Sequence, residues 1–253
     1  MRTQKRNQPS TGSDSVLRLS CPQSWKEMTQ EQLQLTLRLM AEGCKGVELR
    51  TRLLIHFTGL TIHKKSGFGW QCSVNGRPCL LKTWQVQSMI KQLEYVDSHE
   101  EMDVRLESVQ GFKAVDIWLH KVPFKNYLIM EKYYQMYIGD PKPEYLVKLA
   151  GLLYNDGIRQ LDATEELAVI LWYGSVKHRF ARIFHHLFRT TDGQAVKPVA
   201  WVEQMNAQIR ALTGGDVTKE ETIHAIDCWR ALTELDAKAA DVQEMKRKYP
   251  NNN

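Results

Sequence analysis

The sequence predicts a mainly α-helical protein, a multi-helix fold with one small β-hairpin around residues 68–81. Apolar residues recur at three- and four-residue spacing over most of the chain, which is the pattern of helices with one buried face. Sequences typical of helix N-termini precede several of these stretches. An Asn-Gly dipeptide between two runs of β-forming residues predicts the hairpin, because both central turn positions need a positive φ.

Residues 1–21 are rich in Arg, Lys, Gln, Ser and Thr and contain almost nothing to bury. We predict a flexible, slightly basic tail there, with order beginning near Pro22. The stretch has no apolar segment followed by a small-residue cleavage site, so it does not resemble a secretory signal.

Two helices are expected next. Residues 24–27 and 29–32 both fit the capping box, in which two side chains three residues apart satisfy free backbone amides. The first helix continues through apolar residues at helical spacing and ends at Gly43. The second covers about 47–57 and is followed by Gly59.

The hairpin is expected between strands at 68–74 and 77–81, with its turn at Asn75-Gly76. A two-residue turn pairs residue 74 with 77 and residue 72 with 79. Pro78 cannot donate a hydrogen bond to a neighbouring strand, so its strand is expected at an edge of the sheet.

This register places Cys72 opposite Cys79 on one face of the hairpin. Two thiolates with His56 or His63 are a donor set for zinc. The spacing of the two cysteines is unusual for a zinc site, however, and cysteine is commonly buried as a small hydrophobic residue. We therefore expect packing at this pair, with zinc as the alternative.

Helical spacing returns at Thr83, where the expected apolar face comprises Trp84, Met89, Ile90 and Leu93. Residues 97–122 give no clear pattern, and the apolar run at 115–119 fits a short strand or a helical turn. Two more helices are expected, one over 124–138 that is entered through Pro123, and one over about 145–153.

Asn155-Asp-Gly157 is the candidate boundary between a helical domain over 22–155, which carries the hairpin, and a helical C-terminal region over 160–248. Three helices are expected in the C-terminal region. A capping box at Asp162 begins a long helix that reaches about Arg189, a second helix covers 198–212, and the last runs from 218 to 248.

The formal net charge is +5 and 25% of the residues are charged, with the two signs alternating along most of the chain. Contact with an acidic partner is permitted but not required, because dedicated nucleic-acid binders concentrate charge on one face. The five cysteines are an odd and scattered set that fits reduced thiols in a cytoplasm. No stretch approaches the ~20 apolar residues that span a bilayer, so we expect no membrane contact.

No local catalytic signature is present. The sequence lacks a G-x-x-x-x-G-K-[ST] phosphate loop, an H-E-x-x-H zinc motif and a G-x-S-x-G nucleophile turn. We therefore predict a protein that is not an enzyme and that uses no cofactor or metal. An active site without a local signature stays as a third hypothesis.

A basic stripe is expected on the long helix that begins at Asp162. Arg179, Arg182, His186 and Arg189 follow one another at steps of three, four and three, so they share one helix face. This face could contact phosphates or an acidic partner. The alternative, which we favour, is the solvated side of a helix whose other side is core.

The last helix carries an apolar seam at alternating three- and four-residue spacing, as in a coiled coil. The seam consists of Ala225, Cys228, Leu232, Leu235, Ala239 and Val242, with Trp229 beside it. It is shorter than three heptads. It can therefore dock on the helices of the same chain, on a second subunit or on another protein.

Four stretches of the chain resemble uncharacterised helical proteins encoded by phages and prophages of gut bacteria. They are Ser24-Trp-Lys-Glu-Met-Thr-Gln-Glu-Gln-Leu33, Leu80-Leu-Lys-Thr-Trp-Gln-Val86, Val122-Pro-Phe-Lys-Asn-Tyr-Leu128 and Trp229-Arg-Ala-Leu-Thr-Glu-Leu-Asp236. Such proteins are often encoded near tail genes, so the resemblance implies a structural or assembly role, such as that of a tail-assembly chaperone. It carries over no functional residue.

Taken together, the sequence predicts a non-enzymatic binding or assembly protein that acts through exposed amphipathic helices, by self-association or with a protein partner. The second hypothesis is a nucleic-acid-binding accessory protein that uses the basic face at 177–189 and the N-terminal tail. With the resemblance, the expected location is the cytoplasm of a bacterial host cell or the virion.

Overall fold

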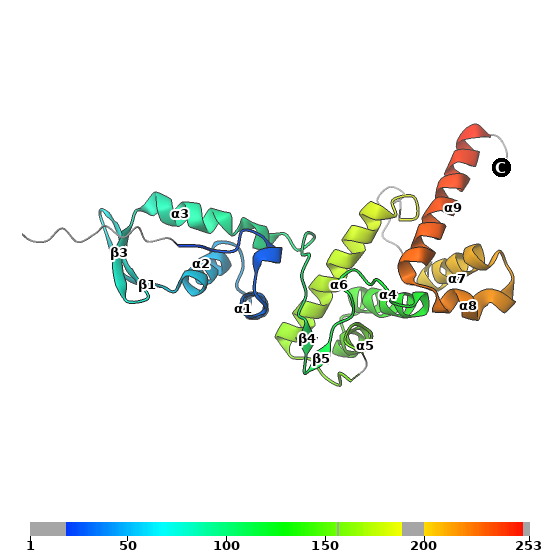
Figure 1. Cartoon of the computed structure of the whole chain (residues 1–253), viewed down its shortest axis with the longest axis horizontal. Coiled ribbons are helices and arrows are strands. Elements are labelled where there is room, and N and C mark those ends of the chain that lie inside the picture. Colours follow the sequence, from blue (N-terminus) through cyan, green and yellow to red (C-terminus); the bar gives the residue numbers. More distant parts are fainter. Residues whose placement is uncertain (1–18, 156, 189–199, 250–253) are drawn as a thin grey trace, which may run out of the picture.

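The computed structural model describes residues 19–155, 157–188 and 200–249. This part of the chain is mainly α-helical, with a three-stranded and a two-stranded antiparallel sheet, so the predicted fold class is confirmed. The molecule is elongated, with the larger sheet at one end and the last helix at the other (Figure 1). Most of the predicted tail lies outside the described residues.

The first two helices follow the prediction closely. They are α1 (Gln30–Ala41) and α2 (Gly46–Thr58), preceded by a 3₁₀ turn at Trp25–Glu27. The Gln32 amide donates to Thr29 Oγ1 (3.2 Å) and the Thr29 amide donates to Gln32 Oε1 (3.0 Å), which completes the predicted capping box. The other predicted box does not form, because Ser24 makes no side-chain cap and Glu27 accepts from the Gln23 amide instead.

The predicted hairpin is confirmed as strands β2 (Gly69–Val74) and β3 (Arg77–Leu81). Cys72 pairs with Cys79, and β3 lies at the edge of the sheet as Pro78 requires. Asn75 and Gly76 have φ values of 49° and 78°, which the turn needs.

A third strand, β1 (Leu60–Ser66), pairs antiparallel with β2 and forms the other edge. The sequence did not predict it. Every residue of β1 between its two ends is exposed, so the strand lacks the alternation of buried and exposed residues by which strands are recognised.

The larger sheet has a small core of its own. Leu60, Cys72, Val74 and Leu81 are buried on one face, and Val86 and Met89 of α3 (Thr83–Gln92) pack against them. Trp84 was predicted on the same face of α3 as Met89, but it is 63% exposed. Five residues turn a helix by about 140° from the starting direction, so the two side chains diverge.

Residues 97–122 are mostly irregular. They follow a 3₁₀ turn at Glu94–Asp97 and contain the short strands β4 (Ser108–Val109) and β5 (Phe112–Lys113). The run at 115–119 is neither strand nor helix. Two distant indoles hold it: Trp172 Nε1 donates to the Ile117 carbonyl (2.9 Å) and Trp229 Nε1 donates to the Trp118 carbonyl (2.5 Å).

The remaining helices pack around one core. They are α4 (Phe124–Gly139), α5 (Pro143–Leu153), α6 (Ala163–Ile183), α7 (Ala200–Thr213), α8 (Glu220–Ala225) and α9 (Cys228–Lys248). Buried residues of α1 and α2 join those of α4, α5, α6 and α9 in a single cluster, and α6 lies against both α1 and α5. The core is therefore continuous across residues 155–160, where the sequence suggested a boundary.

The long helix α6 is shorter than predicted. Its N-terminus is the expected capping box, in which the Glu165 amide donates to Asp162 Oδ1 (2.8 Å). The helix ends at Ile183, because Phe184 leaves the helical conformation with a ψ of 55° and residues 185–187 form a turn. The helix therefore ends at Ile183, before the predicted end at about Arg189.

The last predicted helix is interrupted. Ile226 is extended, and its carbonyl accepts from the Phe124 amide (2.8 Å), while the Cys228 amide donates to the Val122 carbonyl (2.9 Å). Asp227 then starts a new helix, because its carboxylate accepts from the Trp229 amide at 2.8 Å. The single helix expected over 218–248 is thus two helices, α8 and α9.

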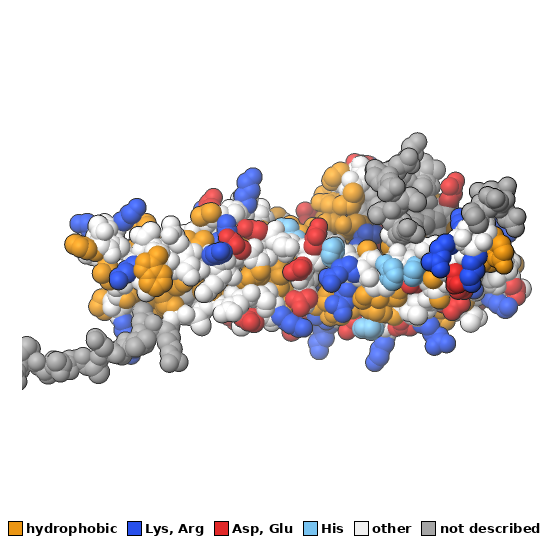
Figure 2. All heavy atoms as spheres, turned by 90° about the horizontal axis from the view of Figure 1, so that it is seen from above, with side chains coloured by type: hydrophobic (Ala, Val, Ile, Leu, Met, Phe, Trp, Pro, Cys, Tyr) orange, Lys and Arg blue, Asp and Glu red, His pale blue; other side chains and the backbone are white. Residues whose placement is uncertain are grey.

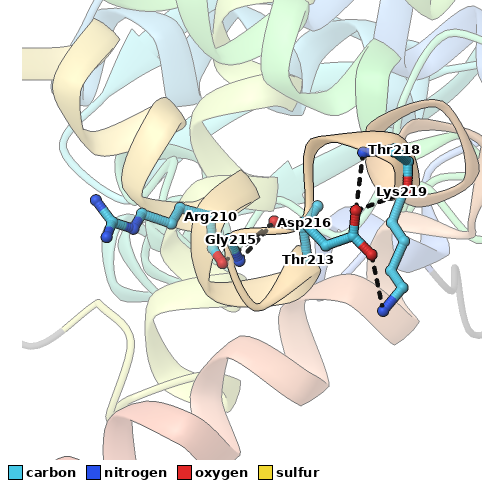
Figure 3. A network of polar contacts seen from close by, with 6 residues as sticks. All are labelled: Arg210, Thr213, Gly215, Asp216, Thr218 and Lys219. Carbon is cyan, nitrogen blue, oxygen red and sulfur yellow. Dashed lines mark hydrogen bonds and ion pairs between the residues drawn. The ribbon is translucent and has the colours of Figure 1, made fainter.

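The last helix was predicted to begin at residue 218, but a 3₁₀ turn at Val217–Lys219 precedes α8 there. Asp216 is the capping residue here: its Oδ1 accepts from the Thr218 amide (3.0 Å) and from Thr218 Oγ1 (2.6 Å) (Figure 3). These hydrogen bonds from Thr218 lower the pKa of the Asp216 carboxyl, and Lys219 Nζ lies 3.3 Å from its other oxygen.

Candidate functional site

The predicted seam divides into a buried part and an exposed part. Cys228 and Leu232 are 0% exposed and Leu235 is 3% exposed, all within the core of the same chain. Trp229, beside them, packs edge-on against Phe180 and Phe184. This half of the seam is therefore occupied by the protein's own helices.

Burial also determines the chemistry of Cys228. Its Sγ donates to the Leu119 carbonyl at 3.2 Å. Burial, followed by the nearby Asp227 carboxylate, raises the pKa of this thiol to about 12. The thiol is therefore protonated and unreactive near neutral pH.

The other seam residues are less covered. Ala225 is exposed on α8, before the interruption, and Ala239 is half-buried on α9. Val242 is 46% exposed, and Met245 and Tyr249, which follow at helical spacing, are 59% and 65% exposed. The far part of α9 extends beyond α7 and α6 (Figure 1), and these three apolar side chains are exposed on it.

The basic stripe predicted on α6 is not a continuous helix face. The Arg179 guanidinium stacks over the Trp118 ring at 4.1 Å, and Arg182 is exposed in the last turn of the helix. His186 lies beyond the end of α6, in the turn that follows. Arg189 lies outside the described residues. The stripe loses its register because the helix ends before its last two members.

A much stronger concentration of positive charge lies elsewhere. Residues 49–93 contain no Asp or Glu, and they hold Arg50, Arg52, Lys64, Lys65, Arg77, Lys82 and Lys91. The rest of the chain has 27 of the 34 Lys and Arg residues and all 29 Asp and Glu residues. The net charge of the whole chain, +5, therefore does not show that one segment is purely basic. Counting charged residues segment by segment along the sequence would have found it.

Most of these cations form no ion pair with the described part of the chain. Arg50 pairs with Glu94 (3.0 Å) and Arg52 with Glu48 (2.8 Å). The other five are exposed, and none of them forms an ion pair with another described residue. Lys64, Lys65, Arg77, Lys82 and Lys91, with Phe68 and Trp84, lie on the larger sheet, its turns and α3, and we call the exposed surface of these elements the basic sheet surface.

Exposed aromatic and aliphatic side chains lie among these cations. Phe68, in the turn between β1 and β2, is 87% exposed, and Trp84 and Leu80 are 63% and 53% exposed. Lys65 Nζ lies 5.2 Å from the centre of the Trp70 ring. Figure 2 shows this end of the molecule with basic and hydrophobic side chains and no acidic ones at its tip.

The two cysteines of the hairpin pack in the small core of the sheet. Cys72 is buried and Cys79 half-buried, and both are free thiols. His63, a candidate zinc ligand with them, instead has its Nε2 2.8 Å from Ser73 Oγ. In the described part of the chain, no third ligand lies close enough to complete a site with the two cysteines.

A different cluster of metal-ligating side chains lies between α6 and α9. One ligand atom from each of His185, His186 and Asp236 lies within 4.8 Å of the other two. Asp236 is fifty residues away from His186 along the chain. The sequence also predicted that both histidines lie within the long helix, whereas they lie in the turn after it. No local sequence signal could have found this cluster.

A surface cleft of about 640 Å³ lies between α1, α2 and α6. Cys44, Asp97 and His99 line it together with apolar residues. Cys44 Sγ contacts Glu48 Oε1 (4.0 Å) and Asp97 pairs with Arg50 (3.6 Å). The Cys44 thiol and the Asp97 carboxylate therefore each contact a partner within the chain.

Comparison of the chain with protein-family models, curated proteins and solved structures finds no match. Among the described helices, none has both the length and the apolar character that crossing a membrane requires.

Proposed function

We propose that this protein binds single-stranded nucleic acid through the basic sheet surface. The observation that carries the proposal is the absence of any acidic residue from 49 to 93, where five exposed cations have no ion-pair partner among the described residues. Unpaired cations gathered in one part of a fold attract a polyanion and release its condensed counterions, which favours binding. This surface replaces the α6 stripe that the sequence suggested.

The aromatic residues favour a single strand over a duplex. Phe68 is 87% exposed and Trp84 is 63% exposed, so a protein without a ligand leaves two large rings in water. In single-strand binders, such rings stack on unpaired bases while Lys and Arg follow the phosphates. In a duplex the bases are already stacked on one another, so they present no free face on which these rings could stack.

The test is fluorescence anisotropy with a labelled single strand of about 16 nucleotides, which matches the site size of compact single-strand binders. The matching duplex and anionic lipid vesicles serve as competitors. We expect the unlabelled single strand to displace the probe most effectively. Displacement by vesicles alone, or no binding at low salt, would contradict the proposal.

Phe68→Ala separates stacking from charge. Removing a stacking ring costs about 1–3 kcal/mol in such complexes, so affinity should fall about 5- to 150-fold without a change in net charge. Val217→Ala, at a position 73% exposed far from the sheet, is the matched control and should leave the affinity unchanged.

A second candidate function is assembly through the far part of α9, with a second copy of this chain as the occupant. Val242, Met245 and Tyr249 form an exposed apolar face there. Acidic Asp241 and Glu244 precede the basic run 246–248, so an antiparallel pair of these helices brings opposite charges together. Light scattering over a concentration series tests this. A monomer at every concentration, or an oligomer that persists in Val242→Lys, would dismiss it.

A further inference from the structure

We infer that His185, His186 and Asp236 form a binding site for one divalent transition-metal ion, with zinc as the best fit. The site is separate from the basic sheet surface and does not depend on nucleic-acid binding. It joins the turn after α6 to the middle of α9, and two imidazoles with one carboxylate are a donor set that zinc commonly accepts.

The three side chains are brought together by the fold. The centres of the two imidazole rings lie 4.1 Å apart, so adjacent residues present their rings side by side. One ligand atom of each of the three residues lies within 4.8 Å of the others. A zinc ion needs ligand atoms about 2.0–2.2 Å from itself, which small side-chain rotations from this arrangement can supply.

Asp236 is held in place by the backbone. Its Oδ1 accepts from the His186 amide (2.8 Å) and from the Leu187 amide (2.9 Å). These two bonds fix the carboxylate against the turn and leave Oδ2 as the oxygen for an ion. The hydrogen bonds also keep the turn folded without metal, so the site is formed before an ion binds.

The contact with Gln243 determines which tautomer of His186 fits the structure. The Gln243 amide nitrogen donates to the His186 carbonyl (3.1 Å), so its Oε1 is the atom that lies 3.2 Å from His186 Nδ1. Nδ1 must therefore carry the proton in the neutral ring, which leaves the Nε2 lone pair for a metal. Histidine ligands in metal sites are commonly oriented by such a hydrogen bond from the other ring nitrogen.

Zinc titration by calorimetry, on the full chain under reducing conditions, tests the site. We expect one ion per chain. His185→Ala, at an exposed position, removes one ligand, and Gln243→Ala removes the orienting bond, which should weaken zinc binding about 10- to 100-fold. Circular dichroism of both metal-free variants checks that they fold.

Two controls separate this site from the cysteines. The pair Cys72→Ser with Cys79→Ser should leave zinc binding unchanged. Cobalt bound to the wild-type protein should give no thiolate-to-metal absorption band. Zinc affinity that is unchanged by His185→Ala, lost in the cysteine variant, or absent from the wild-type protein would overturn the inference.

Discussion

Replacing Lys64 and Arg77 together by Gln should weaken nucleic-acid binding and make its affinity less dependent on salt concentration. Both side chains are exposed and form no ion pair with a described residue, so the change leaves the fold's own interactions intact. Lys64 is on β1 and Arg77 is at the start of β3, at the two edges of the sheet. The substitutions would therefore remove two of the proposed phosphate contacts, one at each edge.

The size of the effect follows from the number of contacts. If the five cations of the basic sheet surface each meet one phosphate, log K should fall with log salt at a slope of about −3.5, since each contact on a single strand contributes about −0.7. The double variant should give about −2.1. Between 50 and 200 mM salt, the wild type should lose about 130-fold in affinity and the variant about 20-fold.

The assay is anisotropy of the labelled single strand at four or more salt concentrations. Lys125→Gln with Lys148→Gln is the matched control, because it removes the same charge from exposed positions of α4 and α5. The control should keep the wild-type slope. An equal reduction of the slope in both double variants would show that net charge alone matters, and an unchanged slope in Lys64→Gln with Arg77→Gln would refute the assignment of the surface.

Three further predictions concern stability. Leu232→Ala should lower the free energy of unfolding by about 2–5 kcal/mol because the side chain is fully buried, whereas Val242→Ala should change it by less than about 0.5 kcal/mol; urea denaturation of both compares the two halves of the seam. Asp227→Ala should cost about 2–4 kcal/mol by the same measurement, because it removes the cap of α9 and leaves the Lys121 amide without its acceptor, and Asp227→Asn should cost less. Burial raises the pKa of Cys228 to about 12 and those of Tyr127 and Tyr173 well above 10, so the folded state keeps protons that the unfolded chain releases. The free energy of unfolding should therefore fall as pH rises from about 9 towards 12, and a flat profile over that range would contradict this reading of the core.

Local signals in the sequence were reliable where a few adjacent residues determine the structure. Asn75-Gly76 fixed the hairpin and its register, and Thr29 and Asp162 formed the capping boxes that their neighbours indicated. Each of these features depends on contacts within four residues. Helix and strand boundaries of this kind need no knowledge of the rest of the chain.

The wrong predictions concern segments whose conformation depends on contacts with residues far away in the sequence. The helix expected over 218–248 has good helical spacing throughout, yet backbone bonds from Val122 and Phe124 hold Ile226 to Cys228 in another conformation. The half of the seam at Cys228 and Leu232 is consumed by packing within the chain, which spacing alone cannot distinguish from a partner's contact. For the same reason, Asp236 could not be placed beside His185 and His186 in advance.

The bridge between Pro123 and Asp227 also constrains how the chain is made. Its two strands of backbone lie about a hundred residues apart, so a ribosome adding about 5–20 residues per second needs roughly 5–20 s to deliver the second after the first. During that interval the Ile117 to Phe124 segment lacks the indole of Trp229 and the carbonyl of Ile226. The middle of the molecule can therefore close only after the first turn of α9 has emerged from the ribosome.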